Sequence, residues 1–304
     1  MKTRDEININ THPATPLKPK GKNYLFIIAV DQYANGISPL HNAVRDAVAF
    51  REVLLEHYQF EAEQCVSLID KAATRNHFDQ QFIRLNQQLT EEDNLVFYFS
   101  GHGTLSKERQ QGYWLLQDAI KGDYTTYLPN FEVINFIKSC PARHVYGIVD
   151  ACFSGTLFRN ETPEPPSRLY HYRSRYLLTA GREERVLDGP MGKNSPFADT
   201  LLQQLKDPNQ ERIWGVDLAR NVLKFIQYQT DVQTPRGDYL KEVQHAGGEM
   251  IFLKKNTSLP DSPKANTAQQ IETNRGVQEE RGKTLHQKAD KIYNIDKIDN
   301  AEFH

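Results

Sequence analysis

The stretch LVFYFSGHG, residues 95–103, decides the fold of this chain together with the stretch VYGIVDACFSG, residues 145–155. Each begins with a short apolar run, typical of a strand buried on both faces of a parallel sheet, and then turns in small and polar residues. The first turn carries His102 and the second carries Cys152. Ligands of open parallel sheets bind at the carboxyl ends of the strands, because the connecting loops separate there. If the two strands are neighbours, about 4.8 Å apart, His102 and Cys152 face each other across one cleft.

Short apolar runs alternate with longer amphipathic segments on both sides of these stretches. This alternation predicts an α/β domain in which helices cover a six-stranded, mainly parallel sheet. The expected strands are residues 24–30, 65–69, 95–100, 145–149, 176–179 and 250–253. Ser38 and Pro39 predict a helix that begins there and ends near His57, and Thr74 predicts the start of the next helix. The other expected helices are residues 131–139, 196–206 and 216–228.

The composition divides the 304 residues into four parts. Residues 1–22 are polar and contain several prolines, which predicts a disordered leader. Residues 23–255 form the α/β domain, and residues 256–288 are a polar linker. In residues 289–304 apolar side chains return between Asn and Asp residues: Ile292, Tyr293, Ile295, Ile298, Ala301 and Phe303.

Charge and cysteine content exclude several classes of protein. The formal net charge of −2 gives no field that would attract nucleic acid or an acidic membrane surface. The three cysteines are odd in number and scattered, so neither a disulfide framework nor a zinc-ligand pattern is present. The longest apolar run, residues 24–30, is too short to span a bilayer, and the first residues lack the apolar segment of a secretory signal. We therefore expect a cytoplasmic protein that binds neither membranes nor nucleic acid.

His102 and Cys152 suit nucleophilic catalysis. A free thiol, with a pKa of about 8.5, is only slightly ionised at neutral pH, and a nearby imidazole supplies the base that activates it. The amide N–H groups of Gly103 and Cys152 are candidates for an oxyanion hole, since donors fixed there bind a tetrahedral oxyanion. An isolated His or Cys is more often structural, and we interpret Cys65 and Cys140 as packing residues.

The turns at residues 100–103 and 150–155, with His102 and Cys152 separated by 50 positions, resemble the catalytic motifs of caspases, metacaspases and their bacterial relatives. Weaker similarity covers residues 113–119, 194–197, 233–235 and 247–248. The resemblance implies a caspase-haemoglobinase-like three-layer sandwich. It also implies a cysteine endopeptidase in which His102 is the general base and Cys152 is the nucleophile that forms a thioester acyl-enzyme.

The same resemblance indicates which bond is cut. Asp150 stands two residues before Cys152, where caspases carry glutamine and metacaspases carry an aspartate that lines the first specificity pocket. By similarity, Asp46 and Ser100 complete this pocket. Two carboxylates in a closed cleft bind a guanidinium through paired hydrogen bonds, and an ammonium less specifically. We therefore expect protein or peptide substrates to be cleaved after Arg, then Lys. The alternative for Asp46 is a solvated helix residue.

Many metacaspases need calcium, which they bind through acidic residues after the histidine strand. Asp118 and Asp123 are present here, but the adjacent Asp pair of that pattern is missing. Calcium requires six to eight oxygen ligands. We expect neither a metal requirement nor a cofactor, and calcium activation has no support in the sequence.

A segment with several prolines follows the cysteine strand, in the position of the linker that caspases cut during activation. Its arginines are candidate self-cleavage sites on an exposed loop: Arg159, Arg168, Arg173 and Arg175. The alternative is an ordinary surface loop.

Residues 289–304 resemble short C-terminal signalling motifs of bacterial immune effectors, some of which are thought to assemble as cross-β. This resemblance implies a regulated effector in bacterial defence, including antiviral defence, or in cell-death signalling, recruited by an adaptor or by self-assembly. A docked amphipathic helix or an inert tail fits the same residues.

Two other functions are compatible with the motifs. One is a catalytically silent caspase-fold scaffold recruited through the C-terminal motif, which the presence of both His102 and Cys152 disfavours. The other is a different cysteine hydrolase, or a transpeptidase, on the same scaffold. A phosphate-binding enzyme has no support, because residues 101–103 are too few for a nucleotide cradle and no Gly-Lys-Ser/Thr motif follows a strand.

Overall fold

The computed structural model describes residues 21–151, 170, 172–181, 188–229, 233–240 and 243–258. Predictions for residues 1–20 and 259–304 therefore lie outside the described residues, as do those for Cys152, Arg159 and Arg168.

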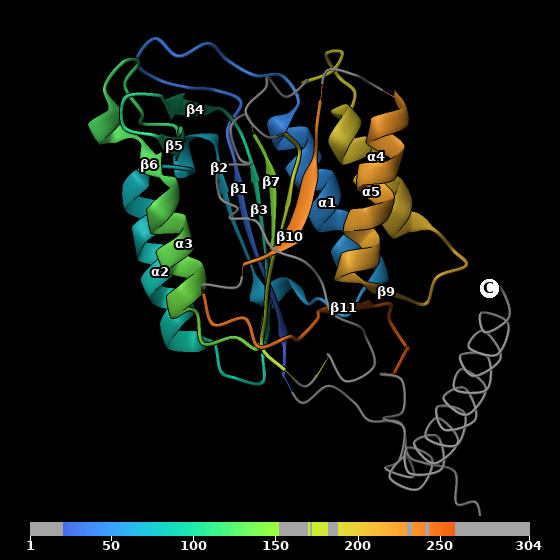
Figure 1. The fold of residues 1–304 in the computed structure, drawn as a ribbon. Coiled ribbons are helices and arrows are strands. Elements are labelled where there is room, and N and C mark those ends of the chain that lie inside the picture. Colours follow the sequence, from blue (N-terminus) through green and yellow to red (C-terminus); the bar gives the residue numbers. More distant parts are fainter. Residues whose placement is uncertain are drawn as a thin grey trace, which may run out of the picture. The chain divides into compact units, whose positions relative to one another are not determined.

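A six-stranded sheet forms the centre of the domain, in the order β10-β8-β7-β3-β1-β2 (Figure 1). Its parallel strands are β1 (Asn23–Ala29), β2 (Cys65–Ile69), β3 (Asn94–Ser100), β7 (His144–Asp150) and β8 (Ser174–Thr179). β3, β7 and β8 are buried along their whole length, as expected for strands covered on both faces. The predicted architecture of a six-stranded, mainly parallel sheet is confirmed.

The sixth strand of this sheet differs from the prediction. The edge strand is β10 (Arg236–Tyr239), which runs antiparallel to β8. Residues 250–253 instead supply β11 (Ile251–Leu253), which pairs with β9 (Arg212–Trp214) in a separate two-stranded sheet. Placing residues 250–253 in the main sheet was wrong. β10 lacks an apolar pattern because it is a half-buried edge strand with an ion pair, Arg236 to Asp238 at 3.2 Å.

Helices cover both faces of the sheet, so that the domain has three layers (Figure 1). One face carries α1 (Ala43–His57), α4 (Pro196–Lys206) and α5 (Gly215–Gln229). The other face carries α2 (Arg75–Gln88) and α3 (Asn130–Ser139). Short 3-10 helices are η1 (Ala62–Gln64), η2 (Asp70–Ala72) and η3 (Tyr124–Thr126). None of the helices in the described part of the chain has the length and apolar character of a membrane span.

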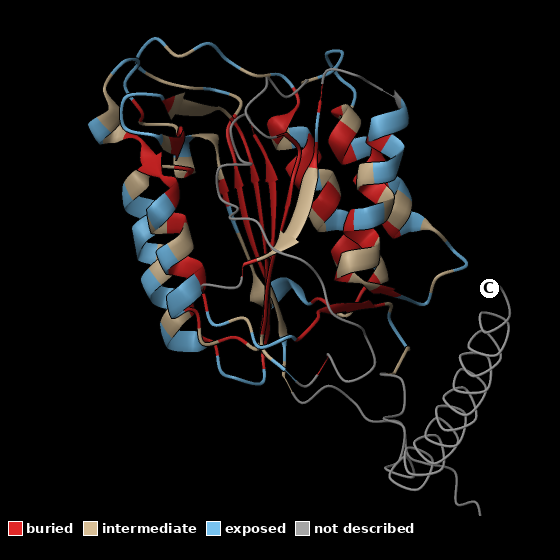
Figure 2. Ribbon diagram, viewed as in Figure 1, coloured by how far each residue is buried: buried red, intermediate tan, exposed pale blue. Residues whose placement is uncertain are grey.

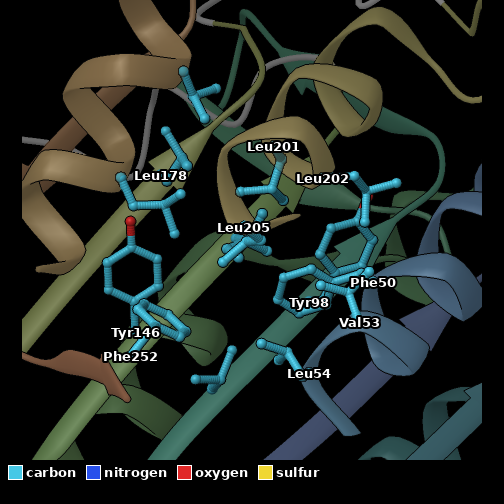
Figure 3. Packing of buried hydrophobic residues seen from close by; sticks show 14 of the residues in the cluster. Phe50, Val53, Leu54, Tyr98, Tyr146, Leu178, Leu201, Leu202, Leu205 and Phe252 are labelled. Carbon is cyan, nitrogen blue, oxygen red and sulfur yellow. The ribbon is translucent and has the colours of Figure 1, made fainter. Parts of the chain in front are cut away.

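Apolar clusters fill the space between the layers, and the buried residues in Figure 2 follow the sheet and the helix faces turned toward it. Beneath α1, α4 and α5, Phe50 stacks on Tyr98 with ring centroids 4.9 Å apart, and Tyr146 meets Phe252 edge-on at 5.3 Å (Figure 3). The Tyr146 hydroxyl donates to the Gly215 carbonyl at 2.9 Å, which satisfies a buried polar atom. Burial on both faces fixes the register of the strands and therefore the position of their ends.

The first long helix begins later than predicted. α1 starts at Ala43 with Asn42 at the N-cap, so the prediction of a start at Ser38 is wrong. The Leu40 amide donates to the Asp31 carbonyl at 2.9 Å, and the Ala43 amide donates to the Asp31 carboxylate at 2.9 Å. These bonds tie residues 38–42 to the end of β1 as a loop.

The other predicted helices are confirmed to within about one residue at their starts. Thr74 caps α2 by accepting the His77 amide, and Ser195 caps α4 by accepting the Ala198 amide. These side chains satisfy backbone N–H groups that have no partner inside the helix.

A small antiparallel sheet follows His102 directly and was not predicted. It contains β4 (Gly103–Ser106), β5 (Gln111–Trp114) and β6 (Leu128–Pro129). Trp114 of β5 stacks on Phe99 of β3, with ring centroids 4.2 Å apart. The turn that carries His102 is therefore held between the main sheet and this small sheet.

Candidate active site

The strands β3 and β7 lie side by side and in register, with Ser100 opposite Asp150. His102 stands two residues after Ser100, and Cys152 stands two residues after Asp150. The prediction that the two strands are neighbours is confirmed. Cys152 itself lies outside the described residues, so its role stays a prediction.

The loop between β1 and α1 holds His102. The backbone N–H of His102 donates to Tyr33 Oη at 2.6 Å, and the two rings lie 5.0 Å apart at an angle of 40°. The Nε2 atom of His102 lies 2.9 Å from the carbonyl oxygen of Ser38. Because a carbonyl can only accept, Nε2 carries the proton of the neutral ring and Nδ1 keeps the lone pair. The basic nitrogen of this histidine is therefore Nδ1.

The Gly103 amide is not used by the ladder between β4 and β5. Gly103 pairs with Trp114, and the Leu115 amide donates to the His102 carbonyl at 2.9 Å just outside this pair. Hydrogen-bonded and non-hydrogen-bonded pairs alternate in an antiparallel ladder, which makes Gly103 a non-hydrogen-bonded position. The Gly103 N–H therefore points away from β5. Since β4 is an edge strand of the small sheet, no described strand of this sheet lies on that side.

Asp46 and Asp150 meet at Ser195, although they come from α1 and β7. The Ser195 amide donates to both carboxylate oxygens of Asp46, each at 3.2 Å, and the Ser195 hydroxyl donates to Asp150 Oδ2 at 3.0 Å. Asp46 is 1% exposed, so the alternative of a solvated helix residue is wrong. Ser100 is also buried and lies opposite Asp150 in the ladder. The structure thus brings the three residues of the predicted pocket to one edge of the sheet.

Burial and neighbouring negative charges favour the protonated form of these carboxylates. Burial, with smaller effects from Asp188 and Asp31, raises the pKa of Asp46 from 3.8 to about 7, against the lowering effect of the hydrogen bonds from Ser195. Burial and the charge of Asp46 raise the pKa of Asp150 well above its usual value. The Oδ1 atom of Asp150 has no hydrogen-bond partner among the described residues. A buried carboxyl oxygen without a partner is costly unless it is protonated or receives a ligand.

The loop before α4 is tied to the start of α1 through Asn42, which is fully buried. The Asn42 side-chain amide donates to the Asp188 carbonyl at 2.6 Å, and its oxygen accepts the Gly192 amide at 3.2 Å. Asp188 is thereby held where its charge raises the pKa of Asp46.

Two of the four arginines considered for self-cleavage lie among the described residues. Arg173 is partly exposed just before β8, which begins at Ser174. Arg175 is fully buried inside β8, where its guanidinium donates to the carbonyls of Ile137 and Cys140. The expectation that Arg175 lies on an exposed loop is wrong, because its side chain satisfies the last carbonyl groups of α3.

Asp118 and Asp123, the acidic residues considered for calcium, make local backbone contacts. Asp118 accepts the Arg75 amide at the first turn of α2, and Asp123 accepts the Thr125 amide at the start of η3. Within the described ranges, no group of three or more His, Cys, Asp or Glu side chains is arranged to hold a metal ion. The absence of a metal requirement stays a prediction.

Sequence reasoning did not assign a role in the site to three residues: Tyr33, Ser38 and Ser195. Tyr33 and Ser38 reach His102 across 69 and 64 positions, respectively, in loop segments without a motif. Ser195 lies in the weak family similarity at residues 194–197 and directly precedes the helix predicted to begin at Pro196, and neither feature gave it a role in the site. Its two carboxylate partners lie 149 and 45 positions away.

A protein-family model described as the caspase domain matches residues 22–242. The chain belongs to the caspase family. Its sequence is 27% identical to Metacaspase-1 of Arabidopsis thaliana over 167 residues, which are 49% of this chain and 44% of that protein. The chain therefore matches less than half the length of this curated relative.

Two solved structures share the fold of this caspase-family chain. Caspase-1 of Spodoptera frugiperda superposes with a TM-score of 0.57 at 13% identity, over 80% of this chain and 94% of that one. A protein of Geobacter sulfurreducens superposes with a TM-score of 0.55 at 17% identity, over 72% of this chain and 93% of that one. At these identities the likeness shows the fold alone, and it confirms the predicted caspase-like three-layer sandwich.

Proposed function

We propose that this caspase-family chain is a cysteine endopeptidase that cleaves after Arg and, less readily, after Lys. The observation that carries the proposal is the buried pair Asp46 and Asp150, which meets beside the end of the strand that leads to Cys152. The neighbouring charges that shift the pKa values of these two residues belong to other carboxylates. A cationic substrate side chain supplies the positive charge that the described residues of this site do not provide.

Cys152 and His102 carry out the chemistry in this proposal. His102 Nδ1 accepts the thiol proton of Cys152, and the thiolate attacks the carbonyl carbon of the substrate Arg. The amides of Gly103 and Cys152 donate to the oxyanion that forms. The imidazolium then gives its proton to the leaving amine as the C–N bond breaks, which leaves a thioester on Cys152. A water molecule that loses a proton to His102 hydrolyses the thioester and restores the thiol.

The preference for Arg over Lys follows from the acceptors. A guanidinium presents its N–H donors in a planar fork, whereas an ammonium is a compact point charge. Asp150 Oδ1 and the two oxygens of Asp46 are acceptors on separate side chains, and both carboxylates are fixed by Ser195. Two separate, oriented acceptors match the fork better than they match the point charge.

A panel of fluorogenic peptides that differ only in the residue before the scissile bond tests the proposal. We expect hydrolysis to be fastest for Arg, slower for Lys and absent for Asp, and we expect Cys152→Ala to hydrolyse none of them. Preference for Asp over Arg would overturn the assignment of the pocket. A wild-type protein that hydrolyses no peptide and does not react with a chloromethyl ketone at Cys152 would indicate the silent scaffold instead.

Regulation is proposed from the sequence alone. Self-cleavage at Arg159, Arg168 or Arg173 and recruitment through residues 289–304 stay predictions, as do the cytoplasmic location and a role in bacterial defence or cell-death signalling. Incubation of wild type beside Cys152→Ala tests the first of these. Fragments that form equally in both proteins would argue against self-cleavage.

A further inference from the structure

Ser195 connects the start of α4 with both carboxylates of the pocket. As the N-cap residue of α4, it accepts the Ala198 amide on its hydroxyl oxygen at 3.1 Å. The same hydroxyl donates to Asp150 Oδ2 at 3.0 Å, and the Ser195 amide donates to both oxygens of Asp46. Ser195 is 3% exposed, so water does not compete for these bonds. Its hydroxyl and its amide therefore both act on the carboxylates, and the hydroxyl lowers the pKa of Asp46 as well as that of Asp150.

The cap bond determines where the hydroxyl proton of Ser195 points. A serine hydroxyl has one proton to donate and lone pairs that accept. Because the lone-pair side of Ser195 Oγ faces the Ala198 amide, its single proton is directed toward the carboxylates, and Asp150 Oδ2 accepts it at 3.0 Å. Oδ2 is therefore an acceptor whether Asp150 is neutral or ionised. The proton of neutral Asp150 lies on Oδ1, the buried oxygen without a partner among the described residues.

The geometry points to Ser195 as the specificity-determining positioning residue of this pocket. It orients Asp46 and Asp150 so that Asp150 Oδ1 gives up a proton when a basic side chain of the substrate enters. This inference rests on the proposed function, since it assigns the pocket to Arg and Lys side chains. Entry of one cation and release of one proton keep the charge of the buried site unchanged.

Among the described residues, the charged groups that shift the pKa values of the two carboxylates are all acidic. Asp31 follows β1 and Asp188 precedes α4. The charges of both raise the pKa of Asp46, and the charge of Asp188 also raises the pKa of Asp150. Tyr98 of β3 is fully buried nearby, and burial together with the charges of Asp150 and Asp46 raises its pKa far above 10, so that it stays neutral.

Two cationic side chains close in the sequence to Asp46 and Ser195 line a different hollow. Arg45 and Lys193 share it with Asp199, and its volume is about 380 Å3. Neither Asp46 nor Asp150 is part of its lining. Within the described ranges, the positive charge of the pocket is therefore left to the substrate.

Steady-state kinetics of Ser195→Ala on Arg and Lys peptides between pH 5.5 and 8.5 test this inference. Removal of a buried hydrogen bond to a charged group predicts that KM for the Arg peptide rises by about tenfold or more, while kcat changes far less. KM for the Arg peptide should fall as the pH rises and Asp150 loses its proton. The bond from Ser195 lowers the pKa of Asp150, so the midpoint of this pH dependence moves upward in Ser195→Ala. A merely structural role for Ser195 would not move this midpoint.

Thr74→Ala is the matched control, because it removes the N-cap of α2 and leaves the pocket unchanged. We expect it to keep the wild-type KM and the wild-type pH midpoint. Ser195→Gly is a second variant in case Ser195→Ala does not fold, since glycine is well tolerated at an N-cap and also lacks the hydroxyl. Ser195→Thr keeps a hydroxyl and should restore most of the affinity for the Arg peptide.

The outcomes separate this inference from the proposed function. A wild type that prefers Arg, with Ser195→Ala or Ser195→Gly matching Thr74→Ala in KM and pH midpoint, overturns the role of Ser195 alone. A wild type that prefers peptides without a basic residue overturns both. A raised Arg KM with a shifted midpoint, confined to the variants without the hydroxyl, supports the role of Ser195.

Discussion

Replacing Asp46 by Asn removes a carboxyl group that is partly protonated in the folded protein near neutral pH. Burial, with smaller effects from Asp188 and Asp31, raises its pKa from 3.8 to about 7. Between about pH 4 and 7 the folded protein therefore binds more protons at this position than the unfolded chain. The free energy of unfolding contributed by Asp46 is largest at low pH and is lost as the pH rises through this range.

The size of the effect follows from the two pKa values. The difference between 3.8 and about 7 corresponds to about 4 kcal/mol, and about 2 to 3 kcal/mol of it falls between pH 5 and pH 8. Asp46→Asn keeps the shape of the side chain and an acceptor for the Ser195 amide, but it has no proton to lose. The free energy of unfolding of the variant minus that of wild type should therefore rise by about 2 to 3 kcal/mol from pH 5 to pH 8, because only wild type loses the contribution of Asp46.

Urea unfolding at both pH values measures this gain, with Cys152→Ala present in both proteins to prevent self-digestion. His144 acts in the opposite direction, because burial lowers its pKa from 6.5 to about 3 and the folded state loses stability as the pH falls below about 6.5. The difference between the two proteins at each pH removes the contribution of His144. The same pH dependence in both proteins would refute the reasoning, because Asp46 would then titrate as in the unfolded chain.

Tyr33→Phe removes the hydroxyl that accepts the His102 amide, so kcat/KM for an Arg peptide should fall by about tenfold while the unfolding midpoint changes little; unchanged kinetics would contradict a positioning role. Gly248→Ala places a methyl group 1.8 Å from the Tyr172 carbonyl oxygen, and urea unfolding should show a loss of about 1 to 3 kcal/mol, whereas an unchanged midpoint would contradict this packing. Dialysis against EDTA should leave the hydrolysis of the Arg peptide unchanged, and a loss that calcium restores would reveal a metal requirement.

The sequence predicts those parts of the fold in which burial or helix capping requires a recognisable pattern of residues. β3 and β7 are covered on both faces, so their residues form continuous apolar runs, and Thr74 marks a helix start by its capping chemistry. β10 was missed because an edge strand bearing Arg236 and Asp238 has no such pattern.

In the candidate site, too, some residues could be predicted from the sequence and others could not. The resemblance pointed to Asp46 and Asp150, but their protonation depends on burial and on contacts between distant parts of the chain. Ser195 joins these residues across 149 and 45 positions, and Tyr33 reaches His102 across 69 positions. A single sequence carries no local signal for such contacts, because they arise only when the strands and loops have packed.

Alkylation by an arginyl chloromethyl ketone, mapped by mass spectrometry, tests most directly whether the carboxylate pair brings a basic side chain to the nucleophile. We expect one adduct, on Cys152, that forms at least about tenfold faster than the adduct of the matching aspartyl reagent. Asp150→Asn should slow the arginyl reaction, and Cys152→Ala should abolish the adduct. An adduct on another residue, or equal rates for the arginyl and aspartyl reagents, would contradict the proposed site.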